Sequence, residues 1–162
     1  MERINSIEEL EKFKNYKSRI LKFKGSVLFN IPIILEAGWS IEADGSIEAG
    51  GSIEADGSIE AGGFIKACRS IKVGGFIEAG WSIEAGGSIE AGGFIEAGWS
   101  IETGGFIKAC RSIKVGGSIE AGEFIEADGS IEAGGFIKAC RSIEAGGFIA
   151  DAINKQLDGD GR

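Results

Sequence analysis

Apolar residues recur along this chain with a period of six. An isoleucine stands at every sixth position from Ile41 to Ile149, without an insertion or a deletion. The usual hexad reads Ile, Glu or Lys, Ala, then two residues that are mostly Gly, then Ser or Phe. This period is too short for a pair of helices and fits one short strand followed by one corner. The pattern therefore predicts a solenoid in which successive hexads stack as strands.

Alternation along each short strand decides which side chains face inward. The isoleucine and the alanine two residues later share one side and form the predicted core, whereas the Glu or Lys between them faces solvent. The next residue is Gly, or Asp at Asp44, Asp56 and Asp128. We expect it to form the corner, because Gly and Asp tolerate positive φ at little cost.

The number of hexads in a coil decides the cross-section. Three hexads give an 18-residue coil and a triangular prism, which is favoured because three Ile and three Ala fill a triangular layer. Two hexads give a flat 12-residue coil with a thin core. The aromatic spacing fits both, since Phe94 follows Phe76 by three hexads and Phe76 follows Phe64 by two. The predicted fold is all-β: a single-stranded parallel β-solenoid, triangular, with about 18 residues per coil, right-handed and with a short N-terminal helix cap.

The flanks of the repeat predict covers for its ends, because uncovered strand edges can pair with another chain. Ser6 and Glu9 form a capping-box pattern that predicts an amphipathic helix over residues 6–17. The resulting division is 1–22 for the N-terminal amphipathic helix and cap, 23–149 for the hexapeptide-repeat solenoid, and 150–162 for a C-terminal cap and tail. The isoleucine frame is expected to continue at Phe23, Phe29 and Leu35, and a short closing helix at Ile149, Ala152, Ile153 and Leu157.

Charge and composition narrow the functional classes. The net charge is −8, with a slightly basic segment at residues 1–34 and a strongly acidic repeat at residues 35–149. An acidic rod repels free nucleic acid and anionic membranes, so we expect a basic protein partner and no direct binding to either. No stretch is long and apolar enough to span a membrane, and the N-terminus lacks a secretory pattern. The prediction is a cytoplasmic protein.

Candidate catalytic groups are few. The chain has no histidine, the commonest general base and zinc ligand, so we expect no enzyme activity, no metal and no cofactor. Cys68, Cys110 and Cys140 each stand in the string Lys-Ala-Cys-Arg. The neighbouring arginines could lower the thiol pKa and make redox sensors. The favoured interpretation is that these are reduced thiols multiplied with the repeat.

The Ile-x-Ala-Gly-x hexads resemble the hexapeptide-repeat parallel β-helices over about 115 residues. The left-handed members carry a small residue four positions after the aliphatic one, and this chain places Trp39, Arg69 or Glu123 there in some hexads. The pattern looks more like bactofilins and other polymer-forming solenoids, which are right-handed. In shape and acidity the chain also resembles the pentapeptide-repeat proteins that imitate DNA.

In an 18-residue coil the outward glutamates Glu42, Glu60, Glu78 and Glu96 stack on one face, which is predicted to be uniformly negative. Lys66, Lys138, Lys72 and Lys108 interrupt the other two faces. The same face is predicted to carry the large aromatic residues Phe76, Phe94, Trp81 and Trp99. Charge and aromatic rings together suggest a contact surface for a partner. The alternative is a Glu-rich hexad multiplied for solubility, with aromatic rings that shield the corners or pack on the N-terminal segment.

Two functional hypotheses follow from the sequence. The first is a non-catalytic acidic binding protein, a DNA-mimic inhibitor of the phage or plasmid anti-defence type, which blocks a basic nucleic-acid-binding partner. The second is a self-assembling scaffold of bactofilin type, whose partner is another copy. A homodimer through the aromatic residues is compatible with both.

Overall fold

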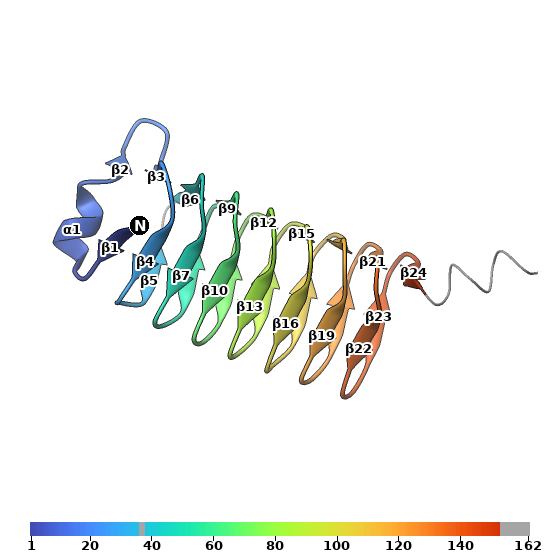
Figure 1. The fold of residues 1–162 in the computed structure, drawn as a ribbon. Helices are drawn as coiled ribbons and strands as arrows, with labels where there is room; N and C mark the ends of the chain where they lie inside the picture. The colour runs from blue at the N-terminus through green and yellow to red at the C-terminus, as the bar shows by residue number, and fades with distance from the viewer. Residues whose placement is uncertain (36–37, 153–162) are drawn as a thin grey trace, which may run out of the picture.

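The computed structural model describes residues 1–35 and 38–152. The chain winds as a parallel β-solenoid whose coils follow one another along one axis, with the N-terminal helix at one end (Figure 1). Each coil contributes one strand to each of three sheets, so strands three apart in chain order are neighbours. In the repeat the partner residues are 18 apart, as for Ile77 and Ile95. The predicted three-sided coil is confirmed, and the 12-residue coil is excluded.

The three sheets form the three faces of the prism. Sheet A contains β1 (Glu2–Ile4), β4 (Val27–Phe29), β7 (Ile47–Ala49), β10 (Ile65–Ala67), β13 (Ile83–Ala85), β16 (Ile101–Thr103), β19 (Ile119–Ala121) and β22 (Ile137–Ala139). Sheet B contains β2 (Lys14–Asn15), β3 (Ile20–Phe23), β6 (Ser40–Ala43), β9 (Ile59–Ala61), β12 (Ile77–Ala79), β15 (Ile95–Ala97), β18 (Ile113–Val115), β21 (Ile131–Ala133) and β24 (Ile149–Ala150). Sheet C contains β5 (Ile33–Leu35), β8 (Ile53–Ala55), β11 (Ile71–Val73), β14 (Ile89–Ala91), β17 (Ile107–Ala109), β20 (Ile125–Ala127) and β23 (Ile143–Ala145).

The core is the interior of the prism. In β12, Ile77 and Ala79 are buried while Glu78 between them is exposed, and the repeat strands from β6 to β21 show the same alternation. Each buried isoleucine stabilises the fold by about 1.5–3 kcal/mol of apolar transfer. Thr103 takes an alanine position, and its buried hydroxyl donates to the carbonyl of Gly87. The predicted inward pairing of Ile and Ala is confirmed.

Glycine is favoured at the corners for a reason that differs from the predicted one. Among the described residues, positive φ occurs at Gly38 and Arg19, and not at the repeated corners or at their aspartates. A Cβ on Gly98 would lie 2.1 Å from the carbonyl oxygen of Gly80, which belongs to the preceding coil. The expectation of positive φ at these corners is therefore wrong. Close contact between the backbones of successive coils is what favours glycine there.

Serine at the last position of the hexad links one coil to the next. The Ser58 N–H donates to the Ser40 hydroxyl at 3.0 Å, and the Phe76 N–H donates to the Ser58 hydroxyl at 3.1 Å. Each such serine satisfies a backbone donor at the same corner of the following coil. These bonds add to the backbone ladder and hold the corners in register.

The N-terminal segment contains less helix than predicted. The helix begins after Ser6, whose hydroxyl accepts from the Glu9 N–H at 3.3 Å, so the predicted capping position is confirmed. However, α1 spans Ile7–Glu11, which is shorter than residues 6–17. The Asn15 side chain accepts from the N–H groups of Lys17 and Ser18 at 3.1 and 3.3 Å. This local turn competes with helix and closes an antiparallel hairpin of β2 and β3.

The first coils follow a different frame from the one predicted. Phe23 pairs with Ala43, and Leu21 pairs with Ile41, so this coil is two residues longer than those of the repeat. The prediction that Phe23, Phe29 and Leu35 continue the isoleucine frame is wrong, because they take the alanine positions. The isoleucine positions are held by Leu21, Val27 and Ile33.

Large rings take the alanine positions at this end of the prism because they fill its terminal layers. Phe23 contacts Phe29 with ring centroids 5.7 Å apart, and Phe13, which follows α1, lies 4.8 Å from Phe23. Residues 1–22 also belong to the sheets themselves: they supply β1 to sheet A, and β2 and most of β3 to sheet B. At the other end Ile149 belongs to β24, and the predicted closing helix and tail fall mostly on residues 153–162, outside the described residues.

Candidate protein-interaction surface

Four glutamates form a continuous row on sheet B. Glu42, Glu60, Glu78 and Glu96 are the outward residues of β6, β9, β12 and β15, and each is in register with the next. We call this row the glutamate ladder. Neighbouring strands are about 4.8 Å apart, so the four carboxylates follow one another along about 14 Å of the rod. The predicted alignment of these four residues is confirmed.

The face is not uniformly negative beyond these four coils. Lys22 is in register with Glu42, and its ammonium group lies 2.9 Å from the Glu42 carboxylate. At the other end Lys114 is in register with Glu96. The predicted lysine-free face is therefore corrected to a ladder with a lysine at each end. Glu60, Glu78 and Glu96 form no ion pair with any cation in the described part of the chain.

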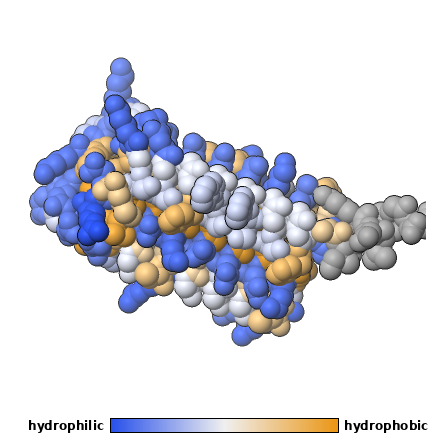
Figure 2. Space-filling view, in the orientation of Figure 1, coloured by the Kyte–Doolittle hydropathy of each residue, from blue (hydrophilic) through white to orange (hydrophobic). Residues whose placement is uncertain are grey.

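On the other two faces, each lysine of the repeat is ion-paired with a glutamate of an adjacent strand. On sheet A, Lys66 lies 2.6 Å from Glu84, and Lys138 pairs with Glu120 in the same way. On sheet C the Lys108 ammonium lies 2.9 Å from Glu126. Hydrophilic side chains project along the whole described rod (Figure 2). Sheet A also has three glutamates in register, Glu84, Glu102 and Glu120, but ion pairs hold the first and the last of them. What distinguishes sheet B is that three consecutive carboxylates lie outside any ion pair of the described residues.

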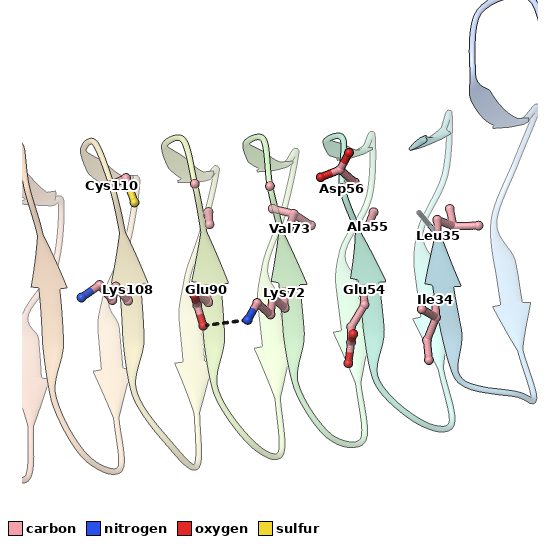
Figure 3. Close-up of a pocket in the computed structure, with 13 residues that line it drawn as sticks. Ile34, Leu35, Glu54, Ala55, Asp56, Lys72, Val73, Glu90, Lys108 and Cys110 are labelled. Atoms are coloured by element: carbon pink, nitrogen blue, oxygen red, sulfur yellow. Dashed lines mark ion pairs between the residues drawn. The ribbon is translucent and has the colours of Figure 1, made fainter. Parts of the chain in front are cut away.

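A shallow groove of about 590 Å³ on sheet C was not predicted from the sequence. Its floor carries Glu54, Lys72, Glu90 and Lys108 in a row, one on each strand, and Lys72 points toward Glu90 at 3.9 Å (Figure 3). Cys110 lies at the corner beside this row (Figure 3). Positive and negative side chains alternate along this row and form ion pairs with one another, which is typical of a solvent-exposed surface without a binding role. Glu42, Glu60 and Glu78 of the ladder, together with Lys22, line a smaller hollow of about 370 Å³ on sheet B.

Glu60 lies inside the ladder, with Glu42 on one adjacent strand and Glu78 on the other. Partial burial raises the pKa of the Glu60 carboxyl above its ordinary value, and the carboxylates of Glu42 and Glu78 on the two adjacent strands raise it further. At the end of the ladder, the hydrogen bond and charge of Glu42 raise the pKa of Lys22. The charge of Lys22 lowers the pKa of Glu60, but burial and the two like charges together outweigh it.

Replacing Glu60 with glutamine is expected to stabilise the protein at pH 7. A carboxyl whose pKa is raised in the folded state destabilises the fold when it is ionised. That penalty disappears as pH falls through the folded pKa toward the unfolded value of about 4.3. The melting temperature of Glu60→Gln should exceed that of the wild type by on the order of 1–3 °C at pH 7. The difference should vanish below pH ~4.

Glu90→Gln is the matched control, because it removes the same charge but breaks the ion pair with Lys72. Its melting temperature at pH 7 should be unchanged or lower. Thermal unfolding followed by circular dichroism from pH 3 to pH 8 measures both variants. Equal gains in the two variants would attribute the effect to overall net charge and contradict the assignment to the ladder.

The predicted aromatic residues lie along both borders of sheet B. Phe76 and Phe94 directly precede β12 and β15 and stack with ring centroids 4.8 Å apart and planes 8° apart. Trp81 and Trp99 follow the same strands at the opposite corner and stack at 6.0 Å and 15°. The phenylalanines are half-buried, whereas Trp81 and Trp99 are 58% and 68% exposed. Glu78 and Glu96 of the ladder therefore lie between two stacks of rings, whereas Ser and Gly occupy these places beside Glu42 and Glu60.

Two further ring contacts were missed by sequence reasoning. Phe106 and Phe124 stack at 4.9 Å beside sheet C, a contact that their spacing of three hexads would have predicted. Trp39 meets Tyr16 of the N-terminal hairpin edge-on at 5.4 Å. Trp39, which was not among the predicted site residues, is thus an aromatic residue that packs on the N-terminal segment. Trp81 and Trp99, two of the predicted site residues, lie farther along the rod and leave much of their surface in solvent.

Comparison of the chain with protein-family models, with curated proteins and with solved structures finds no match. The fold defines the protein as a parallel β-solenoid. The helix in the described part of the chain is too short to cross a bilayer. Cys68, Cys110 and Cys140 are exposed free thiols.

Proposed function

We propose that this protein is a non-catalytic acidic binding protein that occupies the nucleic-acid site of a basic partner, as a DNA-mimic inhibitor of the anti-defence type. The proposal rests on one observation above all: Glu60, Glu78 and Glu96 are stacked in register, and none of them forms an ion pair with another described residue. On the other faces, by contrast, each lysine of the repeat is ion-paired with a glutamate of an adjacent strand. A repeat that served solubility alone would gain from alternating Glu and Lys on this face too. An uncompensated row is favourable when a partner supplies the positive charge.

The spacing of the ladder supports imitation of a phosphate row. One charge about every 4.8 Å corresponds to about 70% of the axial charge density of a single DNA strand, which carries one phosphate per about 3.4 Å. The row is held by a rigid core, so its carboxylates do not have to be ordered on binding. The free thiols are compatible with a reducing compartment, and we place the protein in the cytoplasm.

Two charge-matched variants test the proposal. One replaces Glu42, Glu60, Glu78 and Glu96 by Gln, and the other replaces Glu54, Glu90, Glu126 and Glu144 on sheet C. Both change the net charge from −8 by four units to −4. The probe is a fluorescent decalysine peptide, whose binding is followed by anisotropy with duplex DNA as competitor.

We expect the sheet B variant to bind decalysine more weakly by about fourfold to several hundredfold, since four exposed charge contacts are lost and each contributes roughly 0.2–1 kcal/mol. The sheet C variant should stay within about threefold of the wild type, and DNA should compete for the peptide. Equal losses in the two variants would show that net charge, and not the ladder, binds the peptide. That result would sink the proposal.

A self-assembling scaffold is the second candidate, and the last described coil favours it. Ile137 and Ile143 are only half-buried there, and Phe148 and Ile149 are 57% and 39% exposed, whereas isoleucines in the middle of the rod are fully buried. Light scattering on the same samples separates the candidates. The binding protein should give a monomer of 16.9 kDa or a dimer, and the scaffold should give long species that grow with concentration.

A further inference from the structure

The exposed tryptophan pair stands at the corner between sheet B and sheet A, which we call the tryptophan corner (Trp81 and Trp99). The Trp81 N–H donates to the carbonyl of Gly63 at 3.1 Å, and the Gly117 N–H donates to the carbonyl of Trp99 at 2.5 Å. The residues directly before and after the pair in this column are therefore both glycine. The two indoles cover each other on their inner sides, and no side chain of the column covers their outer sides.

Carboxylates border the tryptophan corner on both sides. Glu78 and Glu96 of the glutamate ladder precede the two tryptophans by three residues, and Glu84 and Glu102 on sheet A follow them by three residues. Glu84 is paired with Lys66, whereas the other three have no cation partner among the described residues. No other described stack of rings has this setting: the half-buried Phe76 and Phe94 stand between the ladder and the ion-paired row of sheet C.

We propose that the tryptophan corner binds arginine side chains of the basic partner. This inference rests on the proposed function and names the chemistry that the partner must present. A guanidinium group is flat, so it can stack on the outer side of an indole while its N–H groups reach the neighbouring carboxylates. An ammonium group lacks the flat face and the fork of donors. A neutral ring ligand would leave the bordering carboxylates without a counter-charge.

The test compares deca-arginine with decalysine on the full chain. The variant is Trp81→Gly with Trp99→Gly, which makes the column match Gly63 and Gly117 and so keeps the hexad pattern. The matched control is Phe76→Ser with Phe94→Ser, which removes the other stack bordering the ladder and restores the serine common at that place. Dissociation constants are measured by titration calorimetry, and circular dichroism confirms that each variant is folded.

The wild type should bind deca-arginine about fivefold to thirtyfold more tightly than decalysine, because each exposed indole side adds a cation–π contact. The tryptophan variant should lose this preference and keep its decalysine affinity within about twofold, while the phenylalanine variant should keep the preference. An unchanged preference in the tryptophan variant would overturn the inference and leave the proposed function standing. Failure of the wild type to bind either peptide would overturn both.

Discussion

Ile77→Ala is expected to lower the free energy of unfolding by about 2–5 kcal/mol, a large share of the roughly 5–15 kcal/mol that stabilises a typical domain. Ile77 is fully buried in the middle of the rod, in register with Ile59 on one side and Ile95 on the other. The alanine would leave a cavity that cannot collapse, because the neighbouring coils are held by backbone bonds on both sides. Urea unfolding followed by circular dichroism measures the effect.

Ile34→Ala is the control for this prediction. Ile34 is also an isoleucine in a short strand, but it takes the outward position of β5 and is 62% exposed. Its replacement should change the free energy of unfolding by less than about 0.5 kcal/mol. Similar effects at the two positions would mean that the isoleucine column does not form the core.

The architecture of the repeat could be predicted because its local and long-range signals agree. An unbroken period of six places every isoleucine on the same side of a strand, and the volume of Ile and Ala suits a triangle better than a thin ribbon. Once the coil holds three hexads, simple addition gives the neighbours of every residue. That arithmetic placed Glu60 between Glu42 and Glu78 without any tertiary information.

The N-terminal coils escaped prediction because two frames compete there. Phe23 and Phe29 lie six apart and fit the isoleucine frame by hydrophobicity, but Leu21 and Val27 lie six apart as well. Only the end of the prism, where large rings can fill the terminal layer against Phe13, decides between the two frames. The predicted helix was too long for a similar reason: the hydrogen bonds of the Asn15 side chain, which form the hairpin turn, leave no periodic signal in the sequence.

The candidate site was predicted in its parts but not in its limits. Lys114 follows Glu96 by three hexads, so counting hexads could have predicted this end of the ladder. The position of Lys22 could not be predicted in the same way, because Lys22 pairs with Glu42 across the longer first coil, where the frame changes. The exposure of Trp81 and Trp99 depends on what packs against each corner, and the sequence carries no periodic mark of that.

The central claim is that residues three hexads apart are neighbours, since only then does the ladder exist. With two-hexad coils Glu78 would lie beside Lys66, and the row of carboxylates would be broken. Pairs of cysteines test the claim in a background in which Cys68, Cys110 and Cys140 are replaced by the glycine common at that position. The hydroxyl oxygens of Ser82 and Ser100 are 3.2 Å apart, close enough for the corresponding sulfurs to bond.

The decisive measurement is disulfide formation on mild oxidation, read by intact mass and non-reducing electrophoresis. Ser82→Cys with Ser100→Cys should cross-link within the monomer almost completely. Ser88→Cys with Ser100→Cys, which are two hexads apart and stand on different corners, should remain reduced. Cross-linking of the second pair without the first would contradict the three-sided coil and, with it, the glutamate ladder.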